Sequence, residues 1–252
     1  MEPRSAPASD DAIAASAVAI DPPAIPRQRW RLVLARDVTA IGTAIGLAGR
    51  EFTDAWEAAI EETGLPLYRP VGRARARVAF GAPVPAGIAL ERELADIVLI
   101  ETVPGWRVRE ALAGRLPEGW RLIDSYDVWL GAPALAGQVA AADYRIDLGD
   151  ADERIVTAAA RALFEAERLP RERVKGGETV TYDLRPLIVD VSIADAGPPL
   201  IVEMRTRFHP VLGTGRPEEV VAALADIAGA SLEMRTVVRE RLILAEDLEV
   251  GS

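Results

Sequence analysis

The chain has 252 residues, a hydrophobic content of 50% and a net charge of −10, which is typical of a folded globular protein with one large or two small domains. It contains no cysteine, so this sequence cannot form a disulfide, a thiolate zinc site or an iron–sulfur cluster. Its acidic balance argues against broad, nonspecific nucleic-acid binding, which requires a positive surface. No cofactor and no metal site are predicted.

The single histidine, His209, stands just before a proline, so we expect a strand-end or turn residue rather than a member of a catalytic triad. No apolar stretch reaches the roughly 20 residues that cross a bilayer. The short apolar stretch Ala12–Ile20 is flanked by aspartates, whereas a secretory signal begins with basic residues. We therefore expect a cytoplasmic protein.

The first half of the chain predicts a tail followed by one domain. Residues 1–27 are rich in Ala, Pro, Ser and Asp, which is typical of a disordered tail. Residues 28–130 alternate strand and helix patterns in the order strand–helix–strand–strand–helix–strand, which predicts a ferredoxin-like α/β sandwich. The expected strands are Arg29–Ala35, Arg75–Phe80, Glu93–Glu101 and Trp120–Leu130, and the expected helices lie within Arg50–Thr63 and Val103–Trp120.

The second half repeats this order. Residues 131–141 are small and predict a linker, and residues 142–252 predict a second domain. That domain has a helix capped by Asp150 and an additional hairpin that turns through Gly176 and Gly177. The predicted fold is therefore α+β, with two tandem ferredoxin-like domains that each have an antiparallel sheet and helices on one face.

One arginine-rich stretch is the first candidate binding site. Within Leu65–Gly87, "LPLYRPVGRARARVAFGAPVPAG", Arg73, Arg75 and Arg77 alternate with alanine. An extended strand would place all three on one face, where they could bind phosphates or carboxylates together with Arg69. The alternative is an edge strand that its charges protect against aggregation.

Two loops and the tryptophans are further candidates. Phe80–Gly87 is restricted by Pro83 and Pro85 and is either a docking element or a connector. Gly213–Val220 places glycines before a helix, but two glutamates already occupy its first turn and the P-loop ending is absent, so we expect an ordinary helix start. All five tryptophans lie in the first half; most should be buried, and an exposed one would mark an interface.

Several stretches together resemble a known family. They are "GLPLYRPVGRARARVAFGAPVPAG", "ERELADIVLI", "KGGETVTYDLRPLI" and "GRPEEVVAALADIAG". They resemble the radical-SAM-linked protein family, a domain of unknown function that is encoded beside, or fused to, a B12-type radical-SAM enzyme. The resemblance extends from about Arg29 to Ala245.

The resemblance implies a non-catalytic accessory protein whose partner is a radical-SAM enzyme or that enzyme's macromolecular substrate. Because the cysteines that hold a radical-SAM cluster are absent from this sequence, any radical chemistry would belong to the partner. The sequence departs from the family at its Ser-His-Leu-Asp motif, where Ala48 to Glu51 stand instead. The matched residues of interest are Phe80, Pro83, Pro85, Glu93, Asp96, Lys175, Asp183 and Arg185.

Two other functions remain open. One is an RNA-binding module in RNA or ribosome modification, which requires exposed aromatic side chains beside the arginine-rich stretch. The other is a hydrolase or transferase that uses Glu93 and Asp96. These two residues are three positions apart, so an extended strand points them to opposite faces. No residue is assigned a catalytic role.

Overall fold

The computed structural model describes residues 25–37, 47–175 and 177–249, so the predicted tail lies largely outside the described residues. The first half of the chain contains β1 (Gln28–Arg36), α1 (Gly49–Glu61), β2 (Ala79–Phe80), β3 (Ala89–Leu99), α2 (Gly105–Leu112) and β4 (Trp120–Val128). The second half contains β5 (Val139–Asp147), α3 (Glu153–Glu165), β6 (Pro170–Lys175), β7 (Glu178–Asp183), β8 (Ile188–Asp195), β9 (Ile201–His209), β10 (Gly213–Thr214), α4 (Pro217–Ala228), β11 (Thr236–Leu244) and α5 (Ala245–Glu249).

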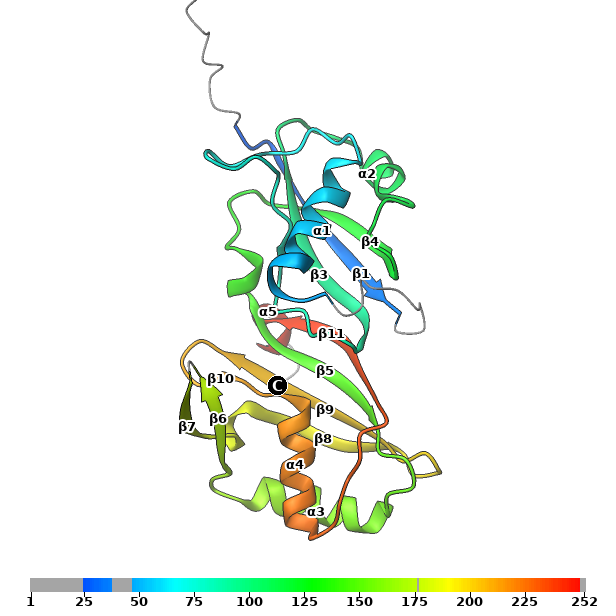
Figure 1. Cartoon of the computed structure of the whole chain (residues 1–252), viewed down its shortest axis with the longest axis vertical. Coiled ribbons are helices and arrows are strands. Elements are labelled where there is room, and N and C mark those ends of the chain that lie inside the picture. Colours follow the sequence, from blue (N-terminus) through cyan, green and yellow to red (C-terminus); the bar gives the residue numbers. More distant parts are fainter. Residues whose placement is uncertain (1–24, 38–46, 176, 250–252) are drawn as a thin grey trace, which may run out of the picture.

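The described strands confirm the α+β class, but they do not form the two separate sheets that the sequence predicts. In the first half the strand order is β4-β1-β3-β2, and in the second it is β11-β5-β9-β8, with antiparallel neighbours throughout. The last strand, β11, also pairs in parallel with the start of β3. The two halves therefore share one nine-stranded sheet, and Figure 1 shows them stacked with β11 crossing between them.

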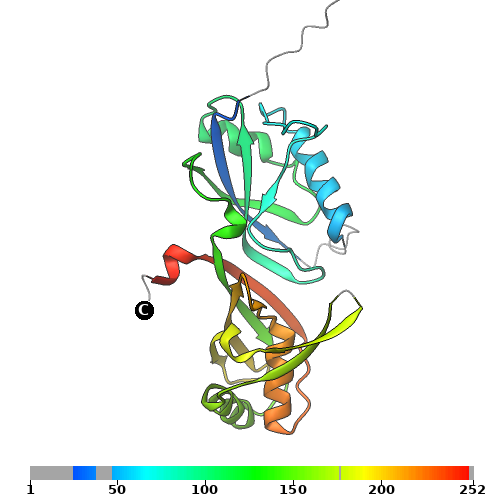
Figure 2. The same ribbon diagram turned by 90° about the vertical axis from the view of Figure 1, so that its left-hand side faces the viewer.

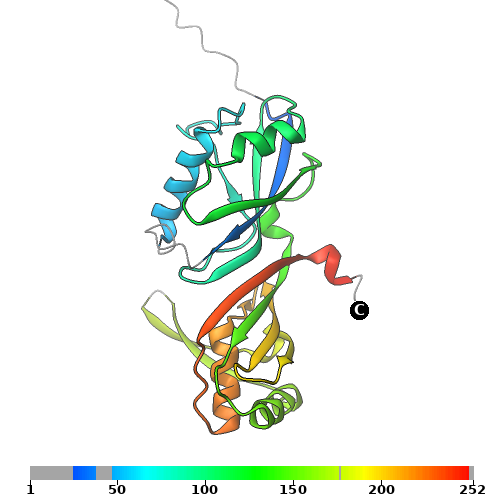
Figure 3. The ribbon, with the colours of Figure 1, turned by 90° about the vertical axis from the view of Figure 1, so that its right-hand side faces the viewer.

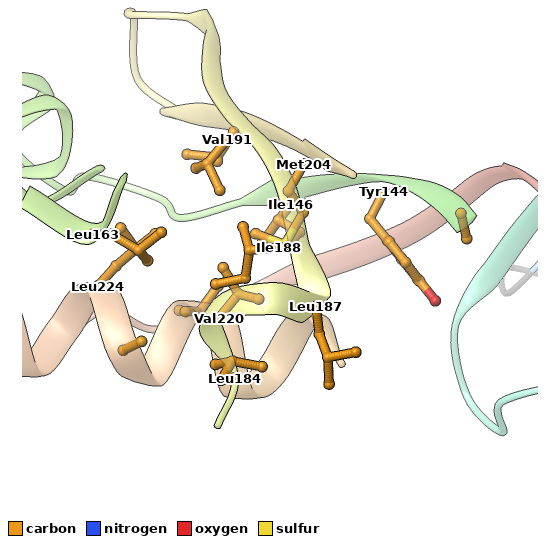
Figure 4. Close-up of a cluster of buried hydrophobic side chains, with 14 of the residues drawn as sticks. Tyr144, Ile146, Leu163, Leu184, Leu187, Ile188, Val191, Met204, Val220 and Leu224 are labelled. Atoms are coloured by element: carbon orange, nitrogen blue, oxygen red, sulfur yellow. The ribbon is translucent and has the colours of Figure 1, made fainter. Parts of the chain in front are cut away.

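Two hydrophobic clusters correspond largely to the two halves, although that of the second half also includes Val33, Ala82 and Leu94 of the first. In the first half, Trp56 and Trp120 meet nearly edge to face with ring centroids 5.0 Å apart, a favoured arrangement for aromatic pairs. In the second half, α3 and α4 pack together over the sheet, and Figure 4 shows Leu163 and Leu224 among the buried side chains. The helix α3 is capped by Asp152, whose carboxylate accepts the Arg154 and Ile155 N–H groups, so the predicted cap at Asp150 was two residues early.

The predicted strand Arg75–Phe80 was wrong over most of its length, since only Ala79–Phe80 is a strand. The reason is that several segments pair with the same edge of β3, so a long strand at 75–80 has no free edge to join. β11 occupies that edge at its start, β2 in its middle and Leu67 at its end. The expected linker also differs, because β5 begins at Val139, within residues 131–141.

The additional hairpin is formed by β6 and β7. It pairs as predicted, although Gly176 lies outside the described residues. Figures 2 and 3 show this hairpin projecting from the second half toward the first, and Figure 3 shows β11 running along the boundary between the halves. β11 and the tip of the hairpin β6–β7 therefore both lie near the boundary between the two halves.

Candidate functional site

The proline loop at Phe80–Gly87 is held by two buried arginines. Arg36 at the end of β1 donates Nη2 hydrogen bonds to the Pro85 carbonyl at 2.5 Å and the Ile88 carbonyl at 2.8 Å. Arg239 on β11 donates from Nη1 to the Pro83 carbonyl at 3.2 Å. Because proline also fixes φ, the loop has little conformational freedom.

Both arginines belong to a buried charged cluster with Glu93. The exposed fractions of Arg36, Glu93 and Arg239 are 1%, 1% and 3%. Arg239 binds the Glu93 carboxylate from Nε at 3.0 Å and also from Nη2, and the Arg36 guanidinium lies 5.3 Å from the Trp120 ring centroid. Burial raises the pKa of Glu93, against the opposing effect of the two arginines. The cluster joins β1, β3 and β11, so it connects the two halves.

A groove of about 490 Å³ lies between the proline loop and the second half. Figure 2 shows the turquoise segment before β3 reaching down toward the second half. Much of the lining is apolar, and the charged residues that line it are Arg216, Glu218 and Arg239. The groove is lined by Pro83, Val84, Pro85, Ala86, Ile88, Tyr144, Phe208, Thr214, Gly215, Arg216, Pro217, Glu218, Met234, Val237 and Arg239.

Tyr144 forms part of the groove wall and is 4% exposed. Figure 4 shows its hydroxyl reaching away from the other labelled core residues, toward the ribbon of the first half. Burial raises the pKa of Tyr144, while the nearby Arg239 acts to lower it. The hydroxyl therefore stays protonated at neutral pH and can act as a hydrogen-bond donor.

The glycine turn before α4 is built for close packing. A Cβ on Gly215 would lie 2.7 Å from the Leu187 carbonyl oxygen, so a side chain there would displace backbone. Thr206 donates to the Gly215 carbonyl at 2.8 Å. These contacts bring the first turn of α4 against the groove, where Arg216 is the exposed N-cap residue.

The arginine-rich stretch does not form the predicted one-faced strand. It follows the acidic helix α1. Arg69 binds Glu61, Arg73 binds Glu57 at 2.6 Å, and Arg75 donates to the Asp54 carbonyl at 3.5 Å. Although burial acts to raise it, hydrogen bonds from Arg69 and from the Ala76 N–H lower the pKa of Glu61. In the described part of the chain, Arg77 has no ion-pair partner.

The other predicted residues also have structural partners. Asp96 receives two hydrogen bonds from buried Arg31, at 2.8 Å and 3.1 Å. Because Glu93 binds Arg239 instead, the two carboxylates do not form one site. His209 ends β9, and its Nδ1 accepts the Val211 and Leu212 N–H groups, which confirms a strand-end and turn role.

The family-matched residues of the second half lie away from the groove lining. Asp183 accepts the Leu169 and Arg185 N–H groups, and Arg185 lies 5.0 Å from the Phe164 ring centroid. The Lys175 side chain lies outside the described part of the chain. Within the described residues, no helix could span a membrane, and no cluster of three His, Asp or Glu side chains is placed to hold a metal ion.

The sequence did not reveal the most important groove residues. Arg36 follows the apolar run Leu32–Ala35, and Arg239 begins the charged triplet 239–241 inside β11. Tyr144 stands in no recognised motif, and Arg216 lies in the Gly213–Val220 stretch, which is predicted to be an ordinary helix start. A cation within or next to an apolar strand segment is a usable signal, because a buried charge requires a partner. That signal says a partner exists, but it does not say which carboxylate provides it.

These features define an α+β protein of two halves that share one sheet and enclose a groove at their boundary. The family described as "Uncharacterized protein conserved in bacteria (DUF2344)" matches residues 48–220. The match covers more than half of the chain, and the chain belongs to this family. A comparison with curated protein sequences gave no match.

Two solved structures show a limited likeness in fold. A chain of "Crystal Structure of a Cbf5-Nop10-Gar1 Complex" matches with a TM-score of 0.45 and 9% identity, over 84% of this chain and 48% of that one. A chain of "Crystal structure of the archaeal box H/ACA sRNP Nop10-Cbf5 complex" matches with a TM-score of 0.34 and 11% identity, over 83% and 56%. This chain therefore spans about half the length of those it matches.

Proposed function

We propose that this chain is a non-catalytic accessory protein of the bacterial cytoplasm, and that it holds a segment of a partner protein in the groove between its halves. The observation that carries the proposal is the clamped proline loop. Two buried arginines hold three carbonyls in and just after that loop, those of Pro83, Pro85 and Ile88. A wall fixed in advance reduces the entropy lost on binding, and pockets at domain boundaries commonly bind ligands.

The groove is then an inter-domain site. We propose that residues 28–130 and residues 142–252 are two ferredoxin-like domains, joined by the predicted linker 131–141, whose last three residues already belong to β5 of the second domain. The strand orders of the two halves, and the helices that connect their strands, support this assignment. The pairing of β11 with β3 favours a fixed angle between the domains, because it makes the sheet continuous.

The proposed partner is a radical-SAM enzyme, and the support for this step is the sequence resemblance described above. The structure argues against RNA binding at the arginine-rich stretch and therefore favours a protein partner. Arg69, Arg73 and Arg75 already have partners on α1, so they do not form a free stripe of positive charge. An apolar groove instead fits side chains of a protein segment.

Replacing Val84 with aspartate tests the groove directly. We expect affinity capture from the native host to recover a radical-SAM enzyme with the wild-type chain, with or without ribonuclease. Val84→Asp should reduce that recovery at least about tenfold, because it places a charge in an apolar contact surface.

The control is Val71→Asp, since Val71 is 87% exposed and does not line the groove. It should leave recovery unchanged. Because Val84 is partly buried against the first-half core, urea denaturation must first show that Val84→Asp stays folded. Equal recovery with Val84→Asp would contradict the groove as the binding site. Recovery of RNA or ribosomal proteins that is lost on ribonuclease treatment would favour the second function below.

A second function, RNA binding, is favoured by one surface of the first half. Trp106 on α2 is 62% exposed, and aromatic side chains stack on unpaired bases. Arg107 and Arg109 on the same helix are exposed and have no ion-pair partner among the described residues. Arg109 and Arg121 line one depression of about 430 Å³. This surface is the better candidate for RNA, because Arg69, Arg73 and Arg75 already have partners on α1.

The RNA function predicts a specific loss. Trp106→Ala should weaken binding of a single-stranded RNA by about tenfold, because stacking on one base contributes about 1–3 kcal/mol. The measurement is fluorescence anisotropy over a range of salt concentrations. Trp129→Ala, which removes a tryptophan that is 78% exposed, is the matched control. If RNA affinity is instead lost when Arg73, Arg75 and Arg77 are all replaced by alanine, the arginine-rich stretch is the RNA-binding site.

A further inference from the structure

The charges around the groove differ from those of the chain as a whole. Arg36, Arg216 and Arg239 lie in or directly behind the groove wall, against Glu93 and Glu218. The local balance is therefore positive, whereas the whole chain has a net charge of −10. Such a site attracts an anionic group at short range, while the negative charge of the whole chain acts against it at longer range and is screened by salt.

Among the three arginines, Arg216 is the one available to a ligand. Arg239 is bound to Glu93 and Arg36 to loop carbonyls. Arg216 is exposed, and in the described part of the chain its guanidinium makes no hydrogen bond or ion pair. It is the N-cap residue of α4, a helix of 12 residues whose first turn already carries Glu218 and Glu219, so the positive charge available to a ligand here is that of the Arg216 guanidinium.

A second arginine stands close to the same turn. The Arg173 guanidinium packs over Gly213, where an added Cβ would lie 3.1 Å from its Nη1. Arg173 also lies 4.8 Å from the Tyr182 ring centroid, which holds it beside the turn. Glu218 is the opposing charge in the groove lining. The remaining wall, including Val84, is largely apolar.

We propose that the partner segment in this groove carries a carboxylate beside an apolar side chain, and that Arg216 binds the carboxylate while the apolar side chain packs against the proline loop. This inference rests on the proposed function and specifies the chemistry of the segment. Arginine binds a carboxylate through two parallel hydrogen bonds, and the loop of Pro83–Ala86 provides the fixed apolar surface.

Two dyes of the same skeleton test this chemistry. 1-Anilinonaphthalene-8-sulfonate carries an anionic group, and N-phenyl-1-naphthylamine does not. Fluorescence titration of the full chain should show the anionic dye binding more tightly at low salt. Arg216→Gln should weaken the anionic dye about five- to tenfold and change the neutral dye less than about twofold, because only the anionic dye uses a charge-assisted contact.

The controls locate the effect. Arg161→Gln removes an exposed arginine of α3, outside the groove, and should change neither dye. Val84→Asp should weaken both dyes, which places them in the groove. Failure of the anionic dye to bind, or equal changes in both dyes with Arg216→Gln, would overturn the proposed chemistry.

Photo-crosslinking tests the natural segment. A benzoylphenylalanine at position 84 should capture a partner peptide that contains Asp, Glu or a terminal carboxylate next to an apolar residue. Capture of a peptide without an acidic group would overturn the ligand chemistry but leave the accessory function standing. Capture of RNA at this position would overturn both. The two proposals can therefore fail separately.

Discussion

Replacing Arg239 with methionine should lower the free energy of unfolding by about 3–5 kcal/mol, because it leaves the Glu93 carboxylate buried without its partner. Glu93 is 1% exposed, so water cannot replace the lost contacts. The substitution also removes the donor to the Pro83 carbonyl, which loosens the groove wall. Urea denaturation measures the loss of stability, and the capture experiment measures the loss of binding.

The double variant Arg239→Met with Glu93→Gln separates the two effects. Removing the charge from both partners should recover only part of the lost stability. The neutral pair avoids the desolvation cost of an isolated carboxylate, but buried Arg36 loses the nearby charge of Glu93. Partner binding should stay weak, because the Pro83 carbonyl still lacks its donor. A stable Arg239→Met single variant would contradict the description of this pair as a structural connection between the halves.

Replacing Asp96 with alanine should also cost about 3–5 kcal/mol, because Arg31 would remain buried as an unpaired cation. The exposed fraction of Arg31 is 3% and that of Asp96 is 4%. Burial acts to lower the pKa of Arg31, and the hydrogen bonds and charge of Asp96, which raise it, are lost in the variant. The guanidinium nevertheless stays charged, because arginine is effectively always protonated in proteins. Thermal and urea unfolding should both report the loss.

This prediction distinguishes a structural carboxylate from a catalytic one. If Asp96 is structural, function should be lost only to the extent that the folded population is lost, and Arg31→Met with Asp96→Leu should restore stability, since an apolar pair can replace a buried ion pair. A stable, folded Asp96→Ala variant without in vivo function would instead support the hydrolase or transferase hypothesis. Surface pairs such as Arg50 with Asp54, which are mostly exposed, are expected to contribute at most about 1 kcal/mol.

The accessory function and the stability of the fold are connected through one strand. β11 pairs with β5 in its own half and with β3 in the other, and it carries Arg239 to both Glu93 and the proline loop. A change that displaces β11 therefore alters the groove as well as the pairing between β11 and β3 that joins the two halves. This is why groove variants are chosen at Val84 and Arg216, which lie in the lining and are not part of the buried pair.

The amino-acid pattern by itself determined the α+β class and the positions of most long elements. β1 and α1 could be predicted because apolar residues recur with the spacing of a strand or helix, and that periodicity depends only on local backbone geometry. The turn at His209 and the hairpin β6–β7 also follow from local residue preferences. The Ala48 to Glu51 stretch forms the start of α1, without the histidine of the family motif.

Only the tertiary structure decided which distant charges meet. Arg73, Arg75 and Arg77 could form a binding stripe only if residues 65–78 were one extended strand. β11, β2 and Leu67 instead share the edge of β3 where such a strand would pair. Arg239 and Glu93 are 146 positions apart. No local pattern pairs them, because the attraction between two ions depends on their distance and burial in space. The groove exists for the same reason: its walls come from both halves and meet only when β11 joins the two parts of the sheet.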